Sequence, residues 1–494
     1  MIDPTAQSYD DVPYDSKPFG QSHPDRLAAI GTLLGLRPAP IERCRVLELG
    51  CAAGGNIVPM ACALPESRFM GVELSARQVA DGVEFVRAMG ARNVELRHLS
   101  ILDITPELGE FDYIIAHGVF SWVPREVQEA LFRVCRENLA PQGIAYISYN
   151  TFPGWRLRGV VRDVMLYHTR QFDEPKMRIA QARAMLEFMA QSVGPGGPYG
   201  TILHGELKAL RQQPDYFVYH EHLENANDPI YFHEFAERLS RHGLAYLADT
   251  EFSVTYPGNF PPEIVQTLAR VTDDHVRIEQ YLDFLLNRSF RHSLVCRREA
   301  PVDRRLSASR LASLHVAATS SKAAAGAGTP DDDLVCELRF PNGVAFSTAS
   351  RVVKTAFAIL ESVWPQSLPT QELHARSLAR VRAGGAEDAA GADALLGVLL
   401  ECYCKGAVHL RSRAVDFALA PGDRPMASAL VRYLATRGNL VTNQLHELVQ
   451  LDEAARRVLP LLDGTRTVEQ VTAQTGVAAA RYVDLFARRA FLVG

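Results

Sequence analysis

Residues 45–56 read RVLELGCAAGGN, and this stretch decides the fold class. The apolar run at 46–49 has the pattern of a buried strand, stops at Gly50, and leads through small residues into a helical pattern. A strand, a tight loop and a helix form the nucleotide-binding unit of doubly wound α/β domains. The dinucleotide fingerprint G-x-G-x-x-G places a glycine where this chain has Ala52. The stretch therefore predicts a nucleotide-type ligand without identifying it.

The composition is that of a globular protein of several domains. The chain has 494 residues, too many for a single core, so we expect two to four domains. Hydrophobic residues make up 47% and charged residues 22%, which is ordinary for such proteins. The net charge of −5 provides no global basic field, so no nucleic-acid partner is expected.

Cysteine spacing and the N-terminal segment predict the compartment. Eight cysteines occur without a CxxC pair, which predicts free thiols in a reducing cytoplasm and no metal centre. The i,i+2 pair His220 and His222 in YHEHLEN has no cysteine nearby and does not change that expectation. The first residues are acidic and polar, unlike a signal peptide, and no run approaches ~18 apolar residues. We expect a cytoplasmic protein with no membrane span.

Strand-like and helical patterns alternate from residue 44 to residue 149. Strands are expected at 44–49, 68–73, 93–98, 111–116 and 143–149, with helices near 55–64, 75–89 and 125–139. This alternation argues for a parallel sheet with right-handed crossovers. Residues 156–240 are mostly helical in pattern and form an insertion. Two further strands, at 242–254 and 290–299, flank a helical stretch at 261–287.

These patterns predict an α/β fold, a seven-stranded Rossmann-like domain with a helical insertion, over residues 41–300. Residues 1–40 are expected to form an N-terminal arm that could fold over the cofactor as a lid. Residues 301–415 are expected to form a middle α+β module, with Asn342-Gly343 at a hairpin turn and helices near 350–363, 371–382 and 391–404. Residues 416–494 are expected to form a smaller winged-helix-like module.

An acidic residue completes the nucleotide-binding pattern. Glu73 ends the second strand, 19 residues after Gly54, where an acid accepts hydrogen bonds from both ribose hydroxyls. Gly50 allows the sharp turn, and Gly54 and Gly55 allow the backbone to approach a ligand closely. Since NAD enzymes use the same arrangement, these residues alone do not identify the nucleotide.

The fourth strand and the flanking segments narrow the choice. FDYIIAHGVFSWVP (111–124) ends a strand at His117-Gly118 and continues into an aromatic loop. With VLELGCAAGGN, GVELS and PQGIAYIS, it resembles class I S-adenosylmethionine-dependent methyltransferases over about 40–155. The arm YDDVPYDSKPFGQSHPDRLAAIGTLLGLRP, the segment SYNTFPGW and the ending NQLHELVQLDEAARRVLPLLDGTRT are similar to a bacterial subfamily with a methyltransferase regulatory domain. This subfamily includes the rickettsial-type outer-membrane-protein lysine methyltransferases.

The resemblance implies S-adenosylmethionine as the cofactor and S-adenosylhomocysteine as its product. The resemblance also implies that Glu48 orders the loop, that Gly50 to Gly54 pack against the methionine part of the cofactor, and that Glu73 holds its ribose. Ser100 stands where the family has an aspartate, so Ser100, Asp103 and the backbone of Ile101 remain alternatives for the adenine. The cofactor-binding residues implied are Glu48, Gly50, Cys51, Ala52, Gly54, Asn56, Glu73, Leu74, Ser100, Ile101, Asp103 and His117.

Candidate catalytic residues come from three segments at the carboxyl edge of the predicted sheet. The candidates are Tyr14 on the arm, His117 and Trp122 after strand four, and Asn150 after strand five. Phe120, Tyr149 and Trp155 are expected beside them. His117 serves equally well as a cofactor contact or as a base, and Trp122 and Trp155 suit packing as well as a channel wall.

The expected activity is S-adenosylmethionine-dependent methyl transfer to lysine side-chain amines of a protein. Transfer from a sulfonium needs positioning and desolvation, with no nucleophile triad or metal. A lysine must lose its proton, and a dry aromatic channel lowers its pKa from ~10.4. The expected partner is a protein substrate, for example a surface or outer-membrane protein before export. The alternatives are a small-molecule N- or O-methyltransferase of a specialised pathway and a cofactor-binding regulator without turnover. The choice between monomer and dimer is open.

Overall fold

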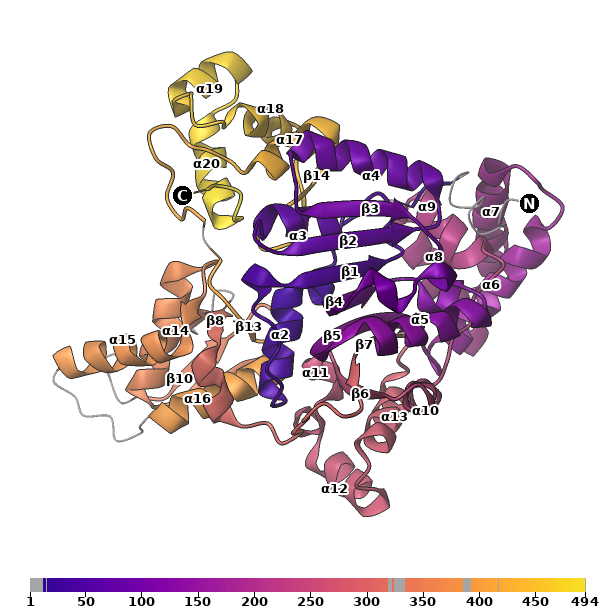
Figure 1. Ribbon diagram of the computed structural model, residues 1–494, viewed down its shortest axis with the longest axis horizontal. Coiled ribbons are helices and arrows are strands. Elements are labelled where there is room, and N and C mark those ends of the chain that lie inside the picture. Colours follow the sequence, from indigo (N-terminus) through magenta and orange to yellow (C-terminus); the bar gives the residue numbers. More distant parts are fainter. Residues whose placement is uncertain are drawn as a thin grey trace.

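Seven strands form one mixed sheet at the centre of the molecule (Figure 1). The computed structural model describes residues 12–14, 16–318, 322–323, 334–384, 392–415 and 417–493. The strands are β1 (Arg45–Leu49), β2 (Arg68–Glu73), β3 (Val94–His98), β4 (Phe111–Ala116), β5 (Leu139–Asn150), β6 (Leu244–Asp249) and β7 (Phe290–Arg297). Their order is β3-β2-β1-β4-β5-β7-β6, and β7 runs antiparallel between β5 and β6. The predicted seven-stranded Rossmann-like sheet is confirmed.

Alternating side chains of the central strands supply two separate cores. Val46 of β1 and Tyr113 of β4 belong to the core beneath α2 (Pro24–Leu33) and α3 (Ile57–Ala63). Leu47 and Ile114 belong to the core beneath α5 (Arg125–Asn138), on the other face. The crossover helix between β2 and β3 is α4 (Ala76–Met89). Burial on both faces explains why these strands are continuous apolar runs.

The helical insertion lies between β5 and β6 and has a core of its own. Its elements are α6 (Trp155–Thr169), α7 (Pro175–Val193), α8 (Gly197–Leu210), α9 (Asp215–Val218), a π-helical turn (Tyr219–Leu223) and α10 (Phe232–Arg241). Val161, Leu186 and Leu203 of α6, α7 and α8 meet in this core. The insertion therefore packs as a unit beside the sheet.

Two expectations between β6 and β7 are wrong in detail. The strand expected at 242–254 ends at Asp249, and the short helix α11 (Phe252–Thr255) follows. The helical stretch expected at 261–287 is two helices, α12 (Pro262–Val271) and α13 (His275–Leu286). The break occurs because the Asp274 carboxylate accepts a hydrogen bond from the Val276 N–H, which caps a new helix.

The residues after β7 form small sheets and helices beside the large sheet. One three-stranded sheet joins β12 (Leu368–Pro369), β8 (His315–Ala318) and β13 (Val408–Arg411). A second joins β9 (Lys322–Ala323), β10 (Cys336–Arg339) and β11 (Ala345–Thr348), and the loop between β10 and β11 holds the predicted Asn342-Gly343 turn. The helices α14 (Arg351–Val363), α15 (Thr370–Ala383) and α16 (Ala392–Cys404) lie close to their predicted positions.

The C-terminal unit has an independent core and the small hairpin of a winged helix. It contains α17 (Ala429–Arg437), β14 (Leu440–Thr442), β15 (Leu448–Gln450), α18 (Glu453–Val458), α19 (Val468–Thr475) and α20 (Ala479–Arg488). Val431, Val441 and Phe486 meet in its core. Figure 1 shows this unit and the insertion helices α6–α8 on opposite sides of the large sheet.

A buried charge network fixes the antiparallel edge of the sheet. The fully buried Arg291 guanidinium of β7 donates to both carboxylate oxygens of Asp283, at 2.8 and 2.9 Å, and to Glu279 Oε2 at 3.0 Å. It also lies over the Phe232 ring, 3.6 Å from its centroid. Because α13 carries both acids and α10 carries Phe232, this one side chain ties two helices to β7.

Replacing Arg291 by Met should lower the free energy of unfolding by about 3–5 kcal/mol, because the buried carboxylates of Asp283 and Glu279 would lose the guanidinium that pairs with both. Urea denaturation followed by circular dichroism measures this change. Arg241→Met removes an exposed ion pair with Glu237 on α10 and should change the same free energy by less than about 1 kcal/mol. Equal losses in the two variants would contradict a dominant role for the buried network.

Candidate functional site

A cleft of about 340 Å³ opens at the carboxyl ends of the central strands. Its lining combines the N-terminal arm, the loops after β1 to β4 and the insertion. The lining residues are Tyr14, Ser16, Lys17, Phe19, Glu48, Gly50, Cys51, Ala52, Asn56, Val72, Glu73, Leu74, Gln78, Leu99, Ser100, Ile101, Leu102, His117, Gly118, Val119, Trp122, Val123, Pro124, Glu126, Val127, His220, Glu221 and Phe290. Most of the predicted cofactor-binding residues are therefore brought together in one place.

The loop after β1 adopts a conformation that depends on glycine. Gly50 has φ +71°, and a Cβ built on it would lie 2.6 Å from Val119 Cγ2. Gly54 has φ +77° but is not among the residues that line the cleft. Ala52 adopts φ +48°, a left-handed conformation that costs a non-glycine residue about 1–2 kcal/mol. The loop therefore keeps its left-handed turn despite alanine in place of the usual glycine.

Glu73 holds this loop and stands at the cleft. Its Oε2 accepts a hydrogen bond from the Ala52 N–H at 2.9 Å, and its Oε1 accepts from the N–H groups of Leu74 and Ser75 at 2.8 and 3.0 Å. Each carboxylate oxygen has more than one lone pair, so the group can also accept from ribose hydroxyls. This geometry fits the predicted ribose role.

Glu48 and Asn56 form the buried floor of the cleft. The Asn56 Nδ2 donates to Glu48 Oε1 at 2.6 Å, while Glu48 Oε2 is buried without a hydrogen-bond partner among the described residues. Burial raises the pKa of Glu48 to about 8. An unpartnered carboxyl oxygen at the wall of a cleft fits a ligand with a cationic or hydrogen-bond-donating group, such as the amino acid part of S-adenosylmethionine.

The loop after β3 contains the three alternative contacts for the adenine ring. Ser100 and Ile101 line the cleft, whereas Asp103 does not. The Ser100 hydroxyl accepts a hydrogen bond from the Leu102 N–H at 3.2 Å and caps the 3₁₀ turn Ile101–Asp103. This placement favours Ser100 and the Ile101 backbone over the Asp103 side chain, and their contact with adenine stays a prediction.

The N-terminal arm covers the cofactor loop. The Gly55 N–H donates to Ser16 Oγ at 2.6 Å, and a Cβ on Gly55 would collide with the Ser16 carbonyl. Position 55 therefore needs a glycine because the arm approaches it closely. The sequence predicts instead that this glycine lets the backbone approach a ligand. Further along, Tyr14 packs against His220, with 5.9 Å between ring centroids. The arm therefore bridges the loop and the insertion.

His117 is a half-buried, stacked side chain at the cleft. The Phe19 ring stacks on it with a centroid separation of 3.6 Å, and its Nδ1 lies 2.8 Å from the Tyr146 hydroxyl. Burial lowers its pKa well below the usual value, so the imidazole is neutral. Trp122 lies edge-to-face against Trp155, at 6.0 Å, and only Trp122 of these two lines the cleft.

Three other predicted neighbours lie away from the cleft. Asn150 is buried and its Nδ2 donates to Asn227 Oδ1 at 3.1 Å. The Tyr149 ring stacks on Phe235 at 4.1 Å, and Phe120 packs in the same core. Phe120, Tyr149 and Trp155 do not line the cleft, although Trp155 packs against Trp122 as expected. A catalytic role for Asn150 stays a prediction that its position does not support.

The charged side chains of the cleft are mostly acidic. Its lining includes four carboxyl groups and one lysine, from Glu48, Glu73, Glu126, Glu221 and Lys17. Glu221 comes from the π-helical turn of the insertion, and burial raises its pKa to about 7 against the opposing effect of Arg158. Glu48, with its pKa of about 8, is largely protonated near neutral pH, so the negative charge comes from Glu73, Glu126 and part of Glu221. This charge still exceeds that of Lys17, and the cleft is therefore suited to cationic ligands.

Sequence reasoning missed several residues of this cleft. Lys17 and Phe19 stand in the quoted arm YDSKPFG, whose apolar and aromatic residues were the available signal. Glu221 lies between His220 and His222, and no spacing in the sequence marks it as a residue of the cleft. Among the described residues no group of three or more His, Cys, Asp or Glu side chains is placed to hold a metal ion. Likewise, no described helix is long and apolar enough to span a membrane.

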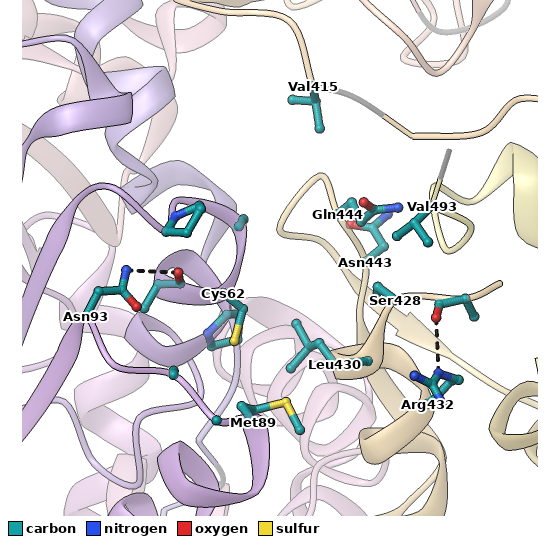
Figure 2. A pocket seen from close by; sticks show the side chains of 18 of the residues that line it. Cys62, Met89, Asn93, Val415, Ser428, Leu430, Arg432, Asn443, Gln444 and Val493 are labelled. Atoms are coloured by element: carbon teal, nitrogen blue, oxygen red, sulfur yellow. Dashed lines mark hydrogen bonds between the residues drawn. The ribbon is translucent and has the colours of Figure 1, made fainter. Parts of the chain in front are cut away.

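A second cleft, of about 730 Å³, separates the large domain from the C-terminal unit (Figure 2). Cys62, Met89 and Asn93 face it from one side, and Leu430 and Gln444 from the other. The charged groups among its lining residues are three arginines, Arg92, Arg413 and Arg432. This cleft therefore differs in charge from the cleft at the carboxyl edge.

Three family models match successive parts of the chain. Residues 46–143 match a methyltransferase domain, residues 214–297 match a methyltransferase regulatory domain, and residues 423–481 match the C-terminal winged-helix domain of PKMT. The regulatory-domain match includes Glu221 and the strands β6 and β7. The segment called regulatory thus contributes both to the sheet and to the cleft.

Two proteins of Rickettsia prowazekii are similar in sequence. Protein RP789 is 46% identical over 60% of this chain and 54% of its own length, so the chain spans about half of that relative. Protein RP028 is 39% identical over 47% of this chain and 94% of its own length. The similarity to RP028 thus extends over nearly that whole protein.

A solved structure shares the whole architecture. The structure of PKMT2 from Rickettsia typhi in complex with AdoHcy superposes with a TM-score of 0.86 at 27% identity, over 98% of this chain and 100% of PKMT2. The chain therefore belongs to the family of S-adenosylmethionine-dependent methyltransferases that join a methyltransferase domain, a methyltransferase regulatory domain and the PKMT winged-helix domain.

Proposed function

We propose that this methyltransferase transfers methyl groups to lysine side-chain amines of a protein substrate. The observation that carries the proposal is the cleft itself, which combines aromatic walls with four carboxyl groups and a single lysine. A lysine arrives as a cation, and the ionised carboxyl groups of the cleft, those of Glu73, Glu126 and part of Glu221, favour its entry. The likeness to PKMT2 over the full length supports the same acceptor, since PKMT denotes a protein lysine methyltransferase.

The side chains of the cleft divide the work of positioning, desolvation and proton removal. S-adenosylmethionine, when bound, supplies a methyl group on a sulfonium whose leaving group is already activated. Glu73 holds the ribose end, and Phe19 and Trp122 exclude water from the reacting groups. Glu221 takes the proton from the lysine ammonium, and the neutral amine then attacks the methyl carbon. A carboxyl group with a pKa of about 7 is suited to this transfer near neutral pH.

We place the reaction in the cytoplasm, on a protein such as a surface or outer-membrane protein before export. All eight cysteines lie among the described residues and are free thiols, which supports a reducing compartment. The acidic cleft argues against anionic acceptors such as nucleic-acid phosphates.

The direct test is incubation of the enzyme with methyl-labelled S-adenosylmethionine and a lysate of the source organism. We expect label in protein bands, on lysines mapped by mass spectrometry, and none with heat-inactivated enzyme. Label confined to small molecules would replace the proposal with a small-molecule methyltransferase. Absence of label, with cofactor binding verified by calorimetry, would indicate a regulator without turnover.

Glu73→Ala should weaken binding of S-adenosylhomocysteine by about 1–3 kcal/mol, because the hydrogen bonds to the ribose are lost. Isothermal titration calorimetry measures the affinity. Glu84→Ala on α4 is the matched control, since that acid does not line the cleft, and it should bind as the unmodified protein does. An unchanged affinity in Glu73→Ala would refute the assignment of the ribose.

Glu221→Gln should reduce kcat for lysine methylation by about 100-fold and leave cofactor affinity unchanged, because the amide cannot accept the lysine proton. The Glu221 carboxyl is protonated below about pH 7 and cannot then accept a proton. The rate of the unmodified enzyme should therefore rise as the pH rises through about 7. In the variant that rise should move toward the pKa of a free lysine, ~10.4. Glu187→Gln on α7, which pairs with Arg211, is the control. A pH profile identical in the variant would rule out this role.

A further inference from the structure

The buried side-chain amide of Asn56 connects three distant parts of the chain. Its Nδ2 donates to Glu48 Oε1 at 2.6 Å and to Ser22 Oγ at 3.1 Å. Its Oδ1 accepts from the Phe19 N–H at 2.9 Å and lies 2.8 Å from His446 Nε2. Asn56 itself lines the cofactor cleft and is 2% exposed. The arm, the cofactor loop and the C-terminal domain therefore meet at one amide.

The chemistry of these partners fixes who donates to whom. A backbone N–H can only donate, so the amide atom facing Phe19 must be the oxygen. That oxygen can only accept, so His446 must carry its proton on Nε2. The imidazole is buried, which lowers its pKa well below the usual value and keeps it neutral. His446 thus donates a shielded, uncharged hydrogen bond to Asn56.

The C-terminal domain holds His446 in place before that bond is made. His446 lies in the loop between β14 and β15 with φ +61°, a conformation uncommon for a residue with a side chain. Asn443 Oδ1 accepts from the N–H groups of Leu445 and Glu447, at 3.0 and 2.8 Å. Gln444 Nε2 donates to the Leu492 carbonyl at 2.8 Å. The loop is therefore anchored within its own domain and presents the imidazole outward.

The hydrogen bond between His446 and Asn56 lies beside the cleft between the two domains. Asn443 and Gln444 of the same loop line that cleft, across from Cys62 of α3 (Figure 2). Asn56 is the N-cap of α3. One end of α3 is thus joined to the loop by the His446 hydrogen bond, while the other end is separated from the loop by open space.

From this geometry we propose that His446 of the winged-helix domain is a positioning residue of the cofactor site and acts through Asn56. Its hydrogen bond fixes the Asn56 amide in the orientation that holds the Glu48 carboxyl on one side and the Phe19 backbone on the other. Without it, the amide oxygen loses a partner and both the floor of the cleft and the arm above it lose a restraint. The role concerns the cofactor and holds for any methyl acceptor.

The test compares variants at position 446 by calorimetry with S-adenosylhomocysteine. His446→Asn tolerates the left-handed backbone but is too short to reach Asn56, and should weaken binding roughly 5- to 30-fold. His446→Gln keeps an N–H donor at the reach of Nε2 and should restore most of the affinity. In turnover assays His446→Asn should raise KM for S-adenosylmethionine more than it lowers kcat.

Two further variants separate positioning from general destabilisation. Tyr433→Leu removes another contact between the domains, the stacking on Phe85 with ring centroids 5.7 Å apart, and should leave cofactor affinity within two-fold. Asn56→Ala should weaken binding, and adding His446→Asn to it should weaken binding little further. Unchanged affinity in a folded His446→Asn protein, equal losses in the Asn and Gln variants, or additive losses with Asn56→Ala would each overturn the proposal.

Discussion

The hydrogen-bonded amide of Asn56 is the constraint on which the cofactor cleft depends. The loop after β1 can form its left-handed turn alone, because Glu73 and two glycines supply what the backbone needs. The floor beneath that loop is different, since Glu48 is buried with a raised pKa and relies on Asn56 for the hydrogen bond that one of its oxygens accepts. Burial of such groups is tolerated only when their partners are held firmly. The cleft thus combines a locally determined loop with a floor that needs the rest of the protein.

Charge is distributed unequally between the two clefts. Among the residues that the structure describes, the lining of the cleft at the carboxyl edge of the sheet includes four carboxyl groups and one lysine, while the lining of the interdomain cleft includes three arginines and no acid. The net charge of −5 gives no hint of this separation. Glu126 is exposed, whereas Glu73 and Glu221 are half-buried in a cleft that Phe19 and Trp122 also line, so the effect of these two carboxyl groups on a cationic ligand is stronger than it would be on an open surface. Attraction of a cationic ligand therefore depends on local enclosure more than on total charge.

Local patterns predict the sheet, and together with the family resemblance they predict the loops after β1 to β4 as parts of the cofactor cleft. The strands follow from apolar runs, and Gly50, Ala52 and Glu73 follow from their spacing around β1 and β2, since neighbouring parallel strands bring their carboxyl ends together. Phe120 and Trp122 could not be told apart, because a 3₁₀ turn directs one ring into the core and the other into the cleft. Phe19, Glu221 and His446 reach the site from the arm, the insertion and the last domain. No periodicity encodes contacts of that sequence separation, and they emerge only from packing.

The hydrogen bond between Asn56 and His446 spans 390 residues, and that distance has a consequence for biosynthesis. A ribosome makes domains from the N-terminus at about 5–20 residues per second, so roughly 20–80 s separate the two residues. During that interval the nascent sheet and its loop exist without the donor that completes the floor. If His446 holds Asn56 as proposed, a chain without the winged-helix domain would bind the cofactor roughly 5- to 30-fold more weakly. Full methylating capacity would then appear only once that domain has folded. The winged-helix domain would then couple its own folding to the strength of cofactor binding.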